Sequence, residues 1–466
     1  MVFFCGCLCI NYNIFRSAKQ VFVKYIVKFL IFRYNTIRNC TEKNNWRKQN
    51  MKYDVIIAGA GPAGISAALE AARSGLKTAL IERYGCVGGN LTMGYVGPVL
   101  GGVCAGTIGE EIEDAVCTAR GVCPDFEKAK IVLTEMLDNA GVDLYLQTAV
   151  TGVRKDGTHL RAVETHGKFG KMDFEADVFI DATGDGDLSV LSGCPWEMGR
   201  EGDGLVQPVT LMFVIDGVDP EQNLLCCHEE HYTDLGDGRE YLDLCHKACR
   251  SGELPENVNI VRLYRTGRKT ERMVNATQEN YINPLDPVSV AKAEIALRRQ
   301  IGKIVAFLRS NIPGFSDITI KGSASTLGVR ESRRIMGRYL LTEEDLMAGR
   351  EFPEAVVHRA SFCLDIHNPA GPGQSEHEEK CPATPKPYDI PFSAMCPLGC
   401  DNLITAGRCI SGTHVAHSSY RVMKICMAMG QAAGAAAKVM LDTGTDTASV
   451  DPVRIREHLI RRGVRL

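Results

Sequence analysis

The chain has 466 residues, of which 45% are hydrophobic and 23% are charged, a composition typical of a globular protein with a sizeable core. Its formal net charge of −3 argues against a nucleic-acid-binding protein, which normally carries a large basic excess. The 19 cysteines lack the spacing of a disulfide framework, and this predicts a reducing, cytoplasmic location.

The first fifty residues differ from the rest of the chain. Residues 1–50 carry nine Lys or Arg and one acid, Glu42. Their apolar run, Val21–Tyr34, is interrupted by basic residues and is shorter than the roughly 20 apolar residues that a spanning helix needs. No signal-peptide cleavage site follows it. We therefore predict a non-native or disordered extension, with Met51 as the initiator; a basic membrane-surface anchor and a targeting peptide are the alternatives.

From Met51 the pattern is that of a doubly wound α/β fold. Tyr53–Ala58 and Leu76–Glu82 are short apolar runs typical of strands, and the Ala-rich segment Pro62–Ser74 between them predicts a helix. This strand–helix–strand order predicts a parallel sheet. The next expected elements are a helix at Asp125–Asn139, a strand at Leu144–Thr148, an antiparallel β-meander at Val150–Phe174 and a buried strand at Val178–Thr183.

The middle of the chain has a different pattern of expected strands, helices and loops. We expect a strand at Val209–Ile215, a helix at Val288–Ser310 and a loop-rich stretch at His367–Pro391. The parallel-sheet pattern then returns with a strand at Asn402–Ala406 and a long Ala-rich helix at Arg421–Leu441. The order predicts a Rossmann-like domain of residues 51–204 and 386–466, split around an inserted α+β substrate domain of residues 205–385.

A glycine motif lies between the first predicted strand and helix, where a dinucleotide-binding fingerprint must lie: Gly59-Ala60-Gly61-Pro62-Ala63-Gly64. In such a motif Gly59 permits the tight turn, Gly61 lets the backbone approach a pyrophosphate, and Gly64 lets the helix pack close to the strand. Glu82 ends the second strand, where it is placed to accept hydrogen bonds from ribose hydroxyls. The motif predicts a bound dinucleotide; an ordinary glycine turn is the alternative.

Several separated stretches resemble a known group of flavoproteins. The glycine motif, Gly88-Gly89, Asp181–Gly186 and Asn402–Gly412 are similar to the FAD-dependent oxidoreductases of the glutathione-reductase-like superfamily. A closer resemblance, to the family that includes the flavin subunit of heterodisulfide reductase, rests on Gly328–Ile335, Thr342–Asp345, Asp365–His367, Tyr388–Pro391, Ala406–Ser411 and Met427–Gly434. The resemblance covers nearly all of residues 51–445 and implies that the cofactor is FAD.

The motif and the resemblance together imply a set of cofactor-binding residues. This set consists of Gly59, Gly61, Pro62, Ala63, Gly64, Glu82, Arg83, Gly88, Gly89, Val150, Ala182, Thr183, Gly184, Gly407, Arg408 and Arg421. Arg408 stands where many members of the wider superfamily carry an acid, so its role at the flavin or phosphate is inferred from the closer family alone. Arg421 is also a candidate on the substrate side.

The candidate catalytic residues are His367, Arg330, Arg333 and His414. The fork of an arginine binds a carboxylate in a bidentate manner, and histidine transfers protons near neutral pH. Each candidate has a structural alternative. The arginines of the 330–334 segment can pair with neighbouring acids at Glu331, Glu343, Glu344 and Asp345. His367 can instead belong to a turn before Asn368-Pro369.

Three absences from the sequence narrow the chemistry. There is no second strand–glycine–helix unit for NAD(P)H, and no Cys-x4-Cys pair follows Gly88-Gly89, since Cys86 precedes it and the next cysteine is Cys104. There is also no ferredoxin-type cysteine run, and we expect no metal.

We predict an FAD-dependent oxidoreductase, a dehydrogenase or reductase that exchanges hydride between flavin and a small organic substrate. The alternative is an electron-transfer flavoprotein subunit of a larger redox complex. No membrane span is expected, and a homo-oligomer or a redox partner protein stays open.

Overall fold

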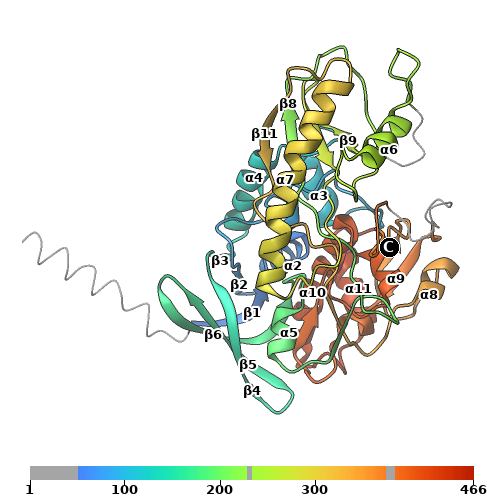
Figure 1. Ribbon diagram of the computed structural model, residues 1–466. Coiled ribbons are helices and arrows are strands. Elements are labelled where there is room, and N and C mark those ends of the chain that lie inside the picture. Colours follow the sequence, from blue (N-terminus) through green and yellow to red (C-terminus); the bar gives the residue numbers. More distant parts are fainter. Residues whose placement is uncertain (1–50, 228–232, 374–383) are drawn as a thin grey trace, which may run out of the picture. The chain divides into compact units, whose positions relative to one another are not determined.

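The computed structural model describes residues 51–227, 233–373 and 384–466. The predicted extension at residues 1–50 lies outside the described residues. Residues 52–466 form one compact unit, and Figure 1 shows its elements. Within the described part of the chain, no helix is both long and apolar enough to cross a membrane.

The main sheet has seven strands in the order β3-β2-β1-β6-β5-β4, with β15 also paired to β6. Its parallel part joins β1, β2 and β3 in register, for example Val55 beside Thr78, and adds β15 beside the end of β6. The remainder, β4 to β6, is an antiparallel meander. The strands are β1 (Met51–Ala58), β2 (Thr78–Ile81), β3 (Asp143–Tyr145), β4 (Ala149–Asp156), β5 (His159–Gly167), β6 (Gly170–Asp181) and β15 (Leu403–Thr405). The predicted α/β fold with a parallel sheet and a meander is confirmed.

The helices that pack with this sheet include two that lie in very close contact, α2 and α10. A Cβ atom on Gly430 would collide with the Ala63 carbonyl oxygen, and one on Gly434 would lie 2.6 Å from the Ala67 carbonyl oxygen. Glycine at both positions therefore lets the two backbones touch. The helices of this part are α2 (Pro62–Arg73), α3 (Ile108–Val116), α4 (Phe126–Asn139), α5 (Asp187–Leu191), α8 (Glu343–Ala348), α9 (His414–Tyr420), α10 (Met423–Thr443) and α11 (Pro452–Arg461), with short 3₁₀ turns η2 (Gly89–Leu91) and η3 (Phe392–Met395).

A second, four-stranded antiparallel sheet has the order β11-β8-β10-β9 and a separate core. Apolar residues of α7, such as Leu297 and Ile301, are buried with Phe213 of β8 in that core, and Figure 1 shows α7 beside β8 and β11. Its elements are β8 (Phe213–Asp216), α6 (Tyr241–Ser251), β9 (Arg262–Arg265), β10 (Arg272–Asn275), α7 (Pro287–Asn311) and β11 (Thr319–Ser323). These lie within the predicted insertion, whose boundaries stay a prediction.

Two small ribbons complete the fold. β7 (Trp196–Met198) pairs with β12 (Arg333–Ile335), and β13 (Ala355–Ala360) pairs with β14 (Tyr388–Pro391). Since Tyr388–Pro391 is a strand, its assignment to a loop-rich stretch was wrong.

Other expected elements also have different bounds, and the strand expected at Leu144–Thr148 is β3, Asp143–Tyr145. Val178–Thr183 is not a separate strand, because β6 runs without a break from Gly170 to Asp181. The second-sheet strand β8 begins at Phe213, and Val209 makes only an isolated bridge with Glu279. The last long helix begins at Met423 rather than Arg421, because a shorter helix, α9, precedes it and ends at Tyr420.

Candidate functional site

The glycine turn after β1 has the geometry that the motif predicts. Gly59 has a φ of +94°, and a Cβ atom there would lie 2.5 Å from the Ala182 carbonyl oxygen. A Cβ atom on Gly64 would collide with the Gly59 carbonyl oxygen. Both positions therefore require glycine for reasons internal to the fold, namely a left-handed turn and a close helix–strand approach.

Gly61 is different, because nothing in the described part of the chain requires glycine there. It is the N-cap of α2 with a φ of −75°, and no described atom lies within 4 Å of the place where its Cβ would be. No side chain caps the helix, and its first turn contains no acid. The open space faces a helix N-terminus, which favours anions such as phosphate. The observed cradle therefore fits a dinucleotide pyrophosphate, and a side chain at residue 61 would fill it.

Glu82, which directly follows β2, stabilises this turn through hydrogen bonds to its carboxylate. Its side chain is 5% exposed, and its two carboxylate oxygens accept hydrogen bonds from the backbone N–H of Ala60 (2.7 Å) and of Tyr84 (2.9 Å). Each oxygen keeps a second acceptor position, so the predicted bonds to ribose hydroxyls stay compatible with this geometry. The Glu82 carbonyl accepts from Thr148 N–H at 2.9 Å, which brings Val150, in β4, close to the same end of the sheet.

The predicted cofactor residues from other segments gather around the turn. Gly88 N–H donates to the Ala60 carbonyl at 2.7 Å, and a Cβ on Gly89 would lie 2.9 Å from Gly61 Cα. Ala182 N–H donates to the Ala58 carbonyl at 2.8 Å, which positions Ala182, Thr183 and Gly184 beside Gly59. A Cβ on Gly407 would lie 3.2 Å from Ala63 Cβ. The structure thus brings four distant glycine-rich segments to one place.

Two predicted cofactor arginines converge on one carboxylate, Asp185. Arg408 Nη2 donates to Asp185 at 2.9 Å, and Arg83 lies 3.7 Å from the same side chain. Burial alone would raise the pKa of Asp185, but Arg408, Ser332 and Arg83 hold it below its ordinary value. Arg408 Nη1 is buried without a hydrogen-bond partner, so one donor of this guanidinium remains for a ligand. Sequence reasoning missed Asp185, although it stands inside the quoted Asp181–Gly186 motif.

Of the candidate catalytic residues, Arg333 and His414 have structural partners. Arg333 forms an ion pair with Asp187 and donates to the Asp185 carbonyl at 2.8 Å. His414 Nδ1 lies 2.8 Å from Glu331 Oε1, and Arg334 pairs with that same carboxylate. Asp345 was an expected partner for an arginine of the 330–334 segment, but it pairs with Arg350 instead. The ion-pair interpretation therefore holds for Arg334 and Glu331, and His414 keeps only Nε2 buried and unpartnered.

His367 and Arg330 belong to a second, buried polar cluster. His367 is 5% exposed; its backbone N–H donates to Gln207 Oε1 at 3.2 Å, and its Nε2 lies 3.6 Å from Asp365 Oδ1. Arg421 Nη2 lies 3.0 Å from Asp365 Oδ2 and donates to Gln207 Oε1 at 3.3 Å. Arg330 Nη1 donates to the Pro208 carbonyl, next to Gln207, at 2.7 Å.

The electrostatics of this cluster keep His367 neutral. Burial lowers the pKa of His367 well below its ordinary value, and Arg330, Arg262 and Arg421 lower it further, against the opposing effect of Asp365. The sequence did not single out Gln207, Arg262 or Asp365 as site residues. Asp365, two residues before His367, was the one detectable signal. Arg421, a candidate for both the cofactor and the substrate side, also lies in this cluster, and its contact with the cofactor stays a prediction.

Cys86, which precedes Gly88-Gly89, has no partner among the described cysteines. Its Sγ lies 3.0 Å from Met93 Sδ, and burial raises the pKa of its thiol. The closest described thiol pair is elsewhere, at Cys194 and Cys400, with 3.6 Å between the sulfurs. Among the residues that the structure describes, no group of histidines, cysteines and acids has the arrangement of a metal site.

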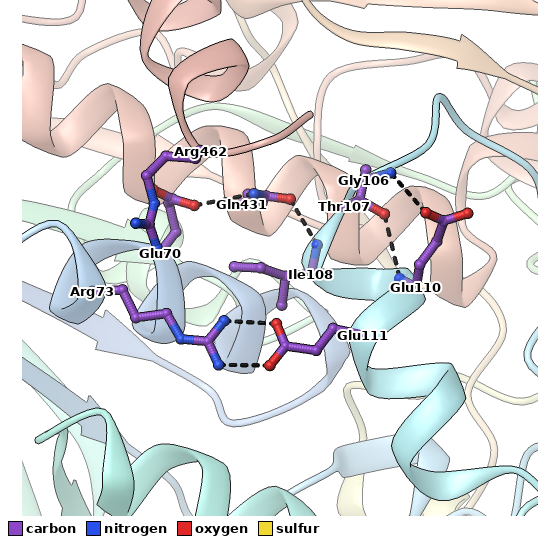
Figure 2. Close-up of a pocket in the computed structure, with 9 residues that line it drawn as sticks. All are labelled: Glu70, Arg73, Gly106, Thr107, Ile108, Glu110, Glu111, Gln431 and Arg462. Carbon is purple, nitrogen blue, oxygen red and sulfur yellow. Dashed lines mark hydrogen bonds and ion pairs between the residues drawn. The ribbon is translucent and has the colours of Figure 1, made fainter. Parts of the chain in front are cut away.

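A polar pocket of about 280 Å³ lies apart from the glycine turn. Figure 2 shows that its charged residues face one another: Arg73 and Glu111 form a two-bond pair at 2.7 and 2.8 Å, and Gln431 joins Glu70 at 3.0 Å to Ile108 N–H. Glu70 stands nine residues beyond Gly61 along α2, about 13 Å away by helix rise. This pocket is not the cofactor cradle.

Comparison with known proteins gives a family. The family model described as "FAD dependent oxidoreductase" matches residues 54–459. Over 164 residues the chain is 30% identical to digeranylgeranylglycerophospholipid reductase of Picrophilus torridus, covering 29% of this chain and 40% of that one. Over 80 residues it is 44% identical to the tRNA uridine 5-carboxymethylaminomethyl modification enzyme of Campylobacter hominis, covering 16% and 11%. The chain thus spans less than half the length of these relatives.

A solved structure is similar over most of its length. The geranylgeranyl bacteriochlorophyll reductase-like protein of Thermoplasma acidophilum has 12% identity, covers 88% of this chain and 83% of its own, and has a TM-score of 0.45. A similarity this low carries no argument about substrate.

Proposed function

The chain belongs to the FAD-dependent oxidoreductase family, and from this premise we propose that it exchanges hydride between FAD and a small organic substrate. The substrate would be held by the buried cluster that contains Arg330, His367 and Arg421. The finer resemblance, to the flavin subunit of heterodisulfide reductase, stays a prediction.

The cofactor assignment is supported by the cradle at the glycine turn. We assign the pyrophosphate to the space in front of Gly61 and the N-terminus of α2, since that space is open and electrostatically favourable. The remaining predicted contacts would come from the segments gathered there: Glu82, Arg83, Gly88, Gly89, Val150, Ala182, Thr183, Gly184, Gly407 and Arg408. When bound, FAD supplies the hydride chemistry, and the protein supplies position and electrostatics.

One observation carries the proposal, namely a buried histidine, His367, that lies beside Asp365 and shares the Gln207 side chain with Arg421. A neutral imidazole can accept or donate a proton at physiological pH, as substrate oxidation or reduction at C–O or C–N bonds requires. Its Nε2 lies 3.6 Å from Asp365, which can orient the ring. Arg330 and Arg421 supply positive charge beside it. These groups can bind a substrate, exclude water around it and move one proton.

A dithiol relay finds no support near the glycine turn. Cys86 contacts a methionine rather than a second cysteine, and its raised pKa disfavours the reactive thiolate. Direct exchange with a bound substrate is therefore the simpler route. An electron-transfer subunit, the alternative, would need an exposed flavin edge and would have no use for a buried polar cluster.

The experiment that tests the proposal uses the purified FAD-loaded protein. The flavin is reduced anaerobically and mixed with a metabolite panel, and the oxidised protein is mixed with the same panel; absorbance of the flavin reports exchange. We expect at least one small molecule to reoxidise or reduce the flavin. If none does, while a protein electron carrier does, the chain is an electron-transfer subunit and the proposal is wrong.

A further inference from the structure

Arg330 is a buried cation that forms no ion pair with any residue that the structure describes. Its side chain is 9% exposed, and its only described hydrogen bond is from Nη1 to the Pro208 carbonyl oxygen. The neighbouring arginines of the same segment differ: Arg333 is ion-paired with Asp187, and Arg334 with Glu331. Among the described residues, no carboxylate lies within ion-pair distance of Arg330.

An unpaired buried charge is costly, so it needs a reason. Removing a cation from water without compensation is strongly unfavourable in proteins. Burial lowers the pKa of Arg330 to about 9, with Arg421 as the next contributor, and the group nevertheless stays charged at neutral pH. The fold therefore maintains a positive charge in its interior that Asp365 offsets without forming an ion pair with Arg330, since it pairs with Arg421 instead.

Two more donors of the cluster lack partners. Gln207 is fully buried. Its Oε1 accepts hydrogen bonds from the His367 backbone N–H and from Arg421, whereas its Nε2 has no partner among the described residues. Arg421 Nη2 donates hydrogen bonds to Asp365, and Arg421 Nε is buried without a partner among the described residues. Buried donors are normally hydrogen-bonded, and unsatisfied ones mark a place where a ligand or water belongs. The orphaned donors here adjoin an unpaired cation.

We propose that Gln207, Arg330 and Arg421 form a carboxylate subsite, and that the substrate of the proposed function is a small organic acid anchored there. A carboxylate presents two acceptor oxygens, which match the fork of a guanidinium and the amide N–H of a glutamine. Binding would neutralise Arg330 and satisfy the orphaned donors. His367 would then lie beside the bound acid as a neutral proton-transferring group. The inference rests on the proposed function only in naming this acid as the substrate.

The test compares two arginines of one segment in the FAD-loaded full chain. Thermal unfolding is measured for the wild type, Arg330→Met and Arg334→Met, each with acetate, malonate or succinate, with the corresponding amides, or with inorganic phosphate. We expect carboxylates, and not amides, to raise the Tm of the wild type. Arg330→Met should keep its FAD, have a ligand-free Tm at least as high as the wild type, and lose the rise. Arg334→Met should lower the ligand-free Tm, because it leaves Glu331 buried without its cation.

Several results would overturn the subsite. These are a ligand-free Tm lowered by Arg330→Met as much as by Arg334→Met, no rise with any carboxylate, an equal rise with amides, or a rise with phosphate alone. The proposed function is judged separately by flavin absorbance. If carboxylates bind but no small molecule exchanges electrons with the flavin, the subsite stands and the function fails. If only uncharged molecules exchange electrons with it, the function stands and the inference fails.

Discussion

At the scale of single residues, a substitution at Gly61 should affect ligand binding without affecting folding. Gly61→Val should leave the fold intact, because no atom of the described residues lies within 4 Å of the new Cβ and the backbone has an ordinary φ. It should abolish FAD binding, because the side chain would fill the pyrophosphate cradle. Flavin absorbance after gel filtration, together with far-UV circular dichroism, measures both effects.

Gly59→Val is the matched control for that substitution. Gly59 has a positive φ, and a Cβ there would press on the Ala182 carbonyl, so this variant should lose stability as well as FAD. Full flavin content in Gly61→Val would show that the fingerprint assignment is wrong.

Sequence reasoning predicted the geometry of the glycine turn better than that of the buried cluster. Gly59, Gly61 and Gly64 sit in one motif whose spacing encodes their geometry, and the structure brings them together as expected. The buried cluster has no such motif, because Gln207 and Arg421 meet from segments more than two hundred residues apart. No local sequence pattern could predict which arginine would lack an ion-pair partner, because this depends on where all the carboxylates lie in the folded protein.

At the scale of elements, the α2–α10 contact holds the helix N-terminus that faces the proposed pyrophosphate cradle. Gly430→Ala should force these helices apart, because its Cβ would collide with the Ala63 carbonyl oxygen. Overpacking of this kind costs about 1–3 kcal/mol. Urea unfolding should show that loss, and FAD should bind more weakly, since Ala63 is in the first turn of α2.

Gly302→Ala is the control for this contact. Gly302 lies in α7, and nothing lies within 4 Å of its Cβ position. Alanine there should stabilise the protein by about 0.5–1 kcal/mol, as in an ordinary exposed helix. If Gly430→Ala has the same stabilising effect, α2 and α10 do not pack closely at Gly430.

The elements themselves were largely predictable, and their ends were not. The βαβ start and the helix α7 follow from apolar runs and from breakers at their ends. The break between α9 and α10 was missed, because Arg421 and Val422 are not breakers by type. Tyr388–Pro391 was missed as a strand because its partner, β13, is distant in sequence and the pairing is irregular.

At the scale of the whole molecule, two buried histidines make stability depend on pH. Burial lowers the pKa of His367 and of His417 well below the ordinary value, with Arg330 and Arg334 respectively as the next contributors. Both folded pKa values are depressed, so the unfolded chain takes up protons first as pH falls below about 6.5. Stability is then lost by about 1.4 kcal/mol per pH unit for each histidine.

Urea unfolding between about pH 7.5 and about pH 5.5 measures this loss. His417→Phe removes one of the two titrating groups and should reduce the slope by about one proton. An unchanged slope in that variant, or equal stability at both pH values, would mean that the histidines protonate freely in the folded protein.

The central claim is that the flavin exchanges hydride directly with a substrate held beside His367. Anaerobic stopped-flow absorbance of the flavin, with the substrate found in the metabolite panel, tests it most directly in wild type, His367→Ala and Cys86→Ser. The account predicts unchanged FAD content in all three, normal rates in Cys86→Ser, and rates slowed by about 10²–10⁴ in His367→Ala, as for loss of a general acid or base. The contradicting result is that Cys86→Ser blocks turnover while His367→Ala does not.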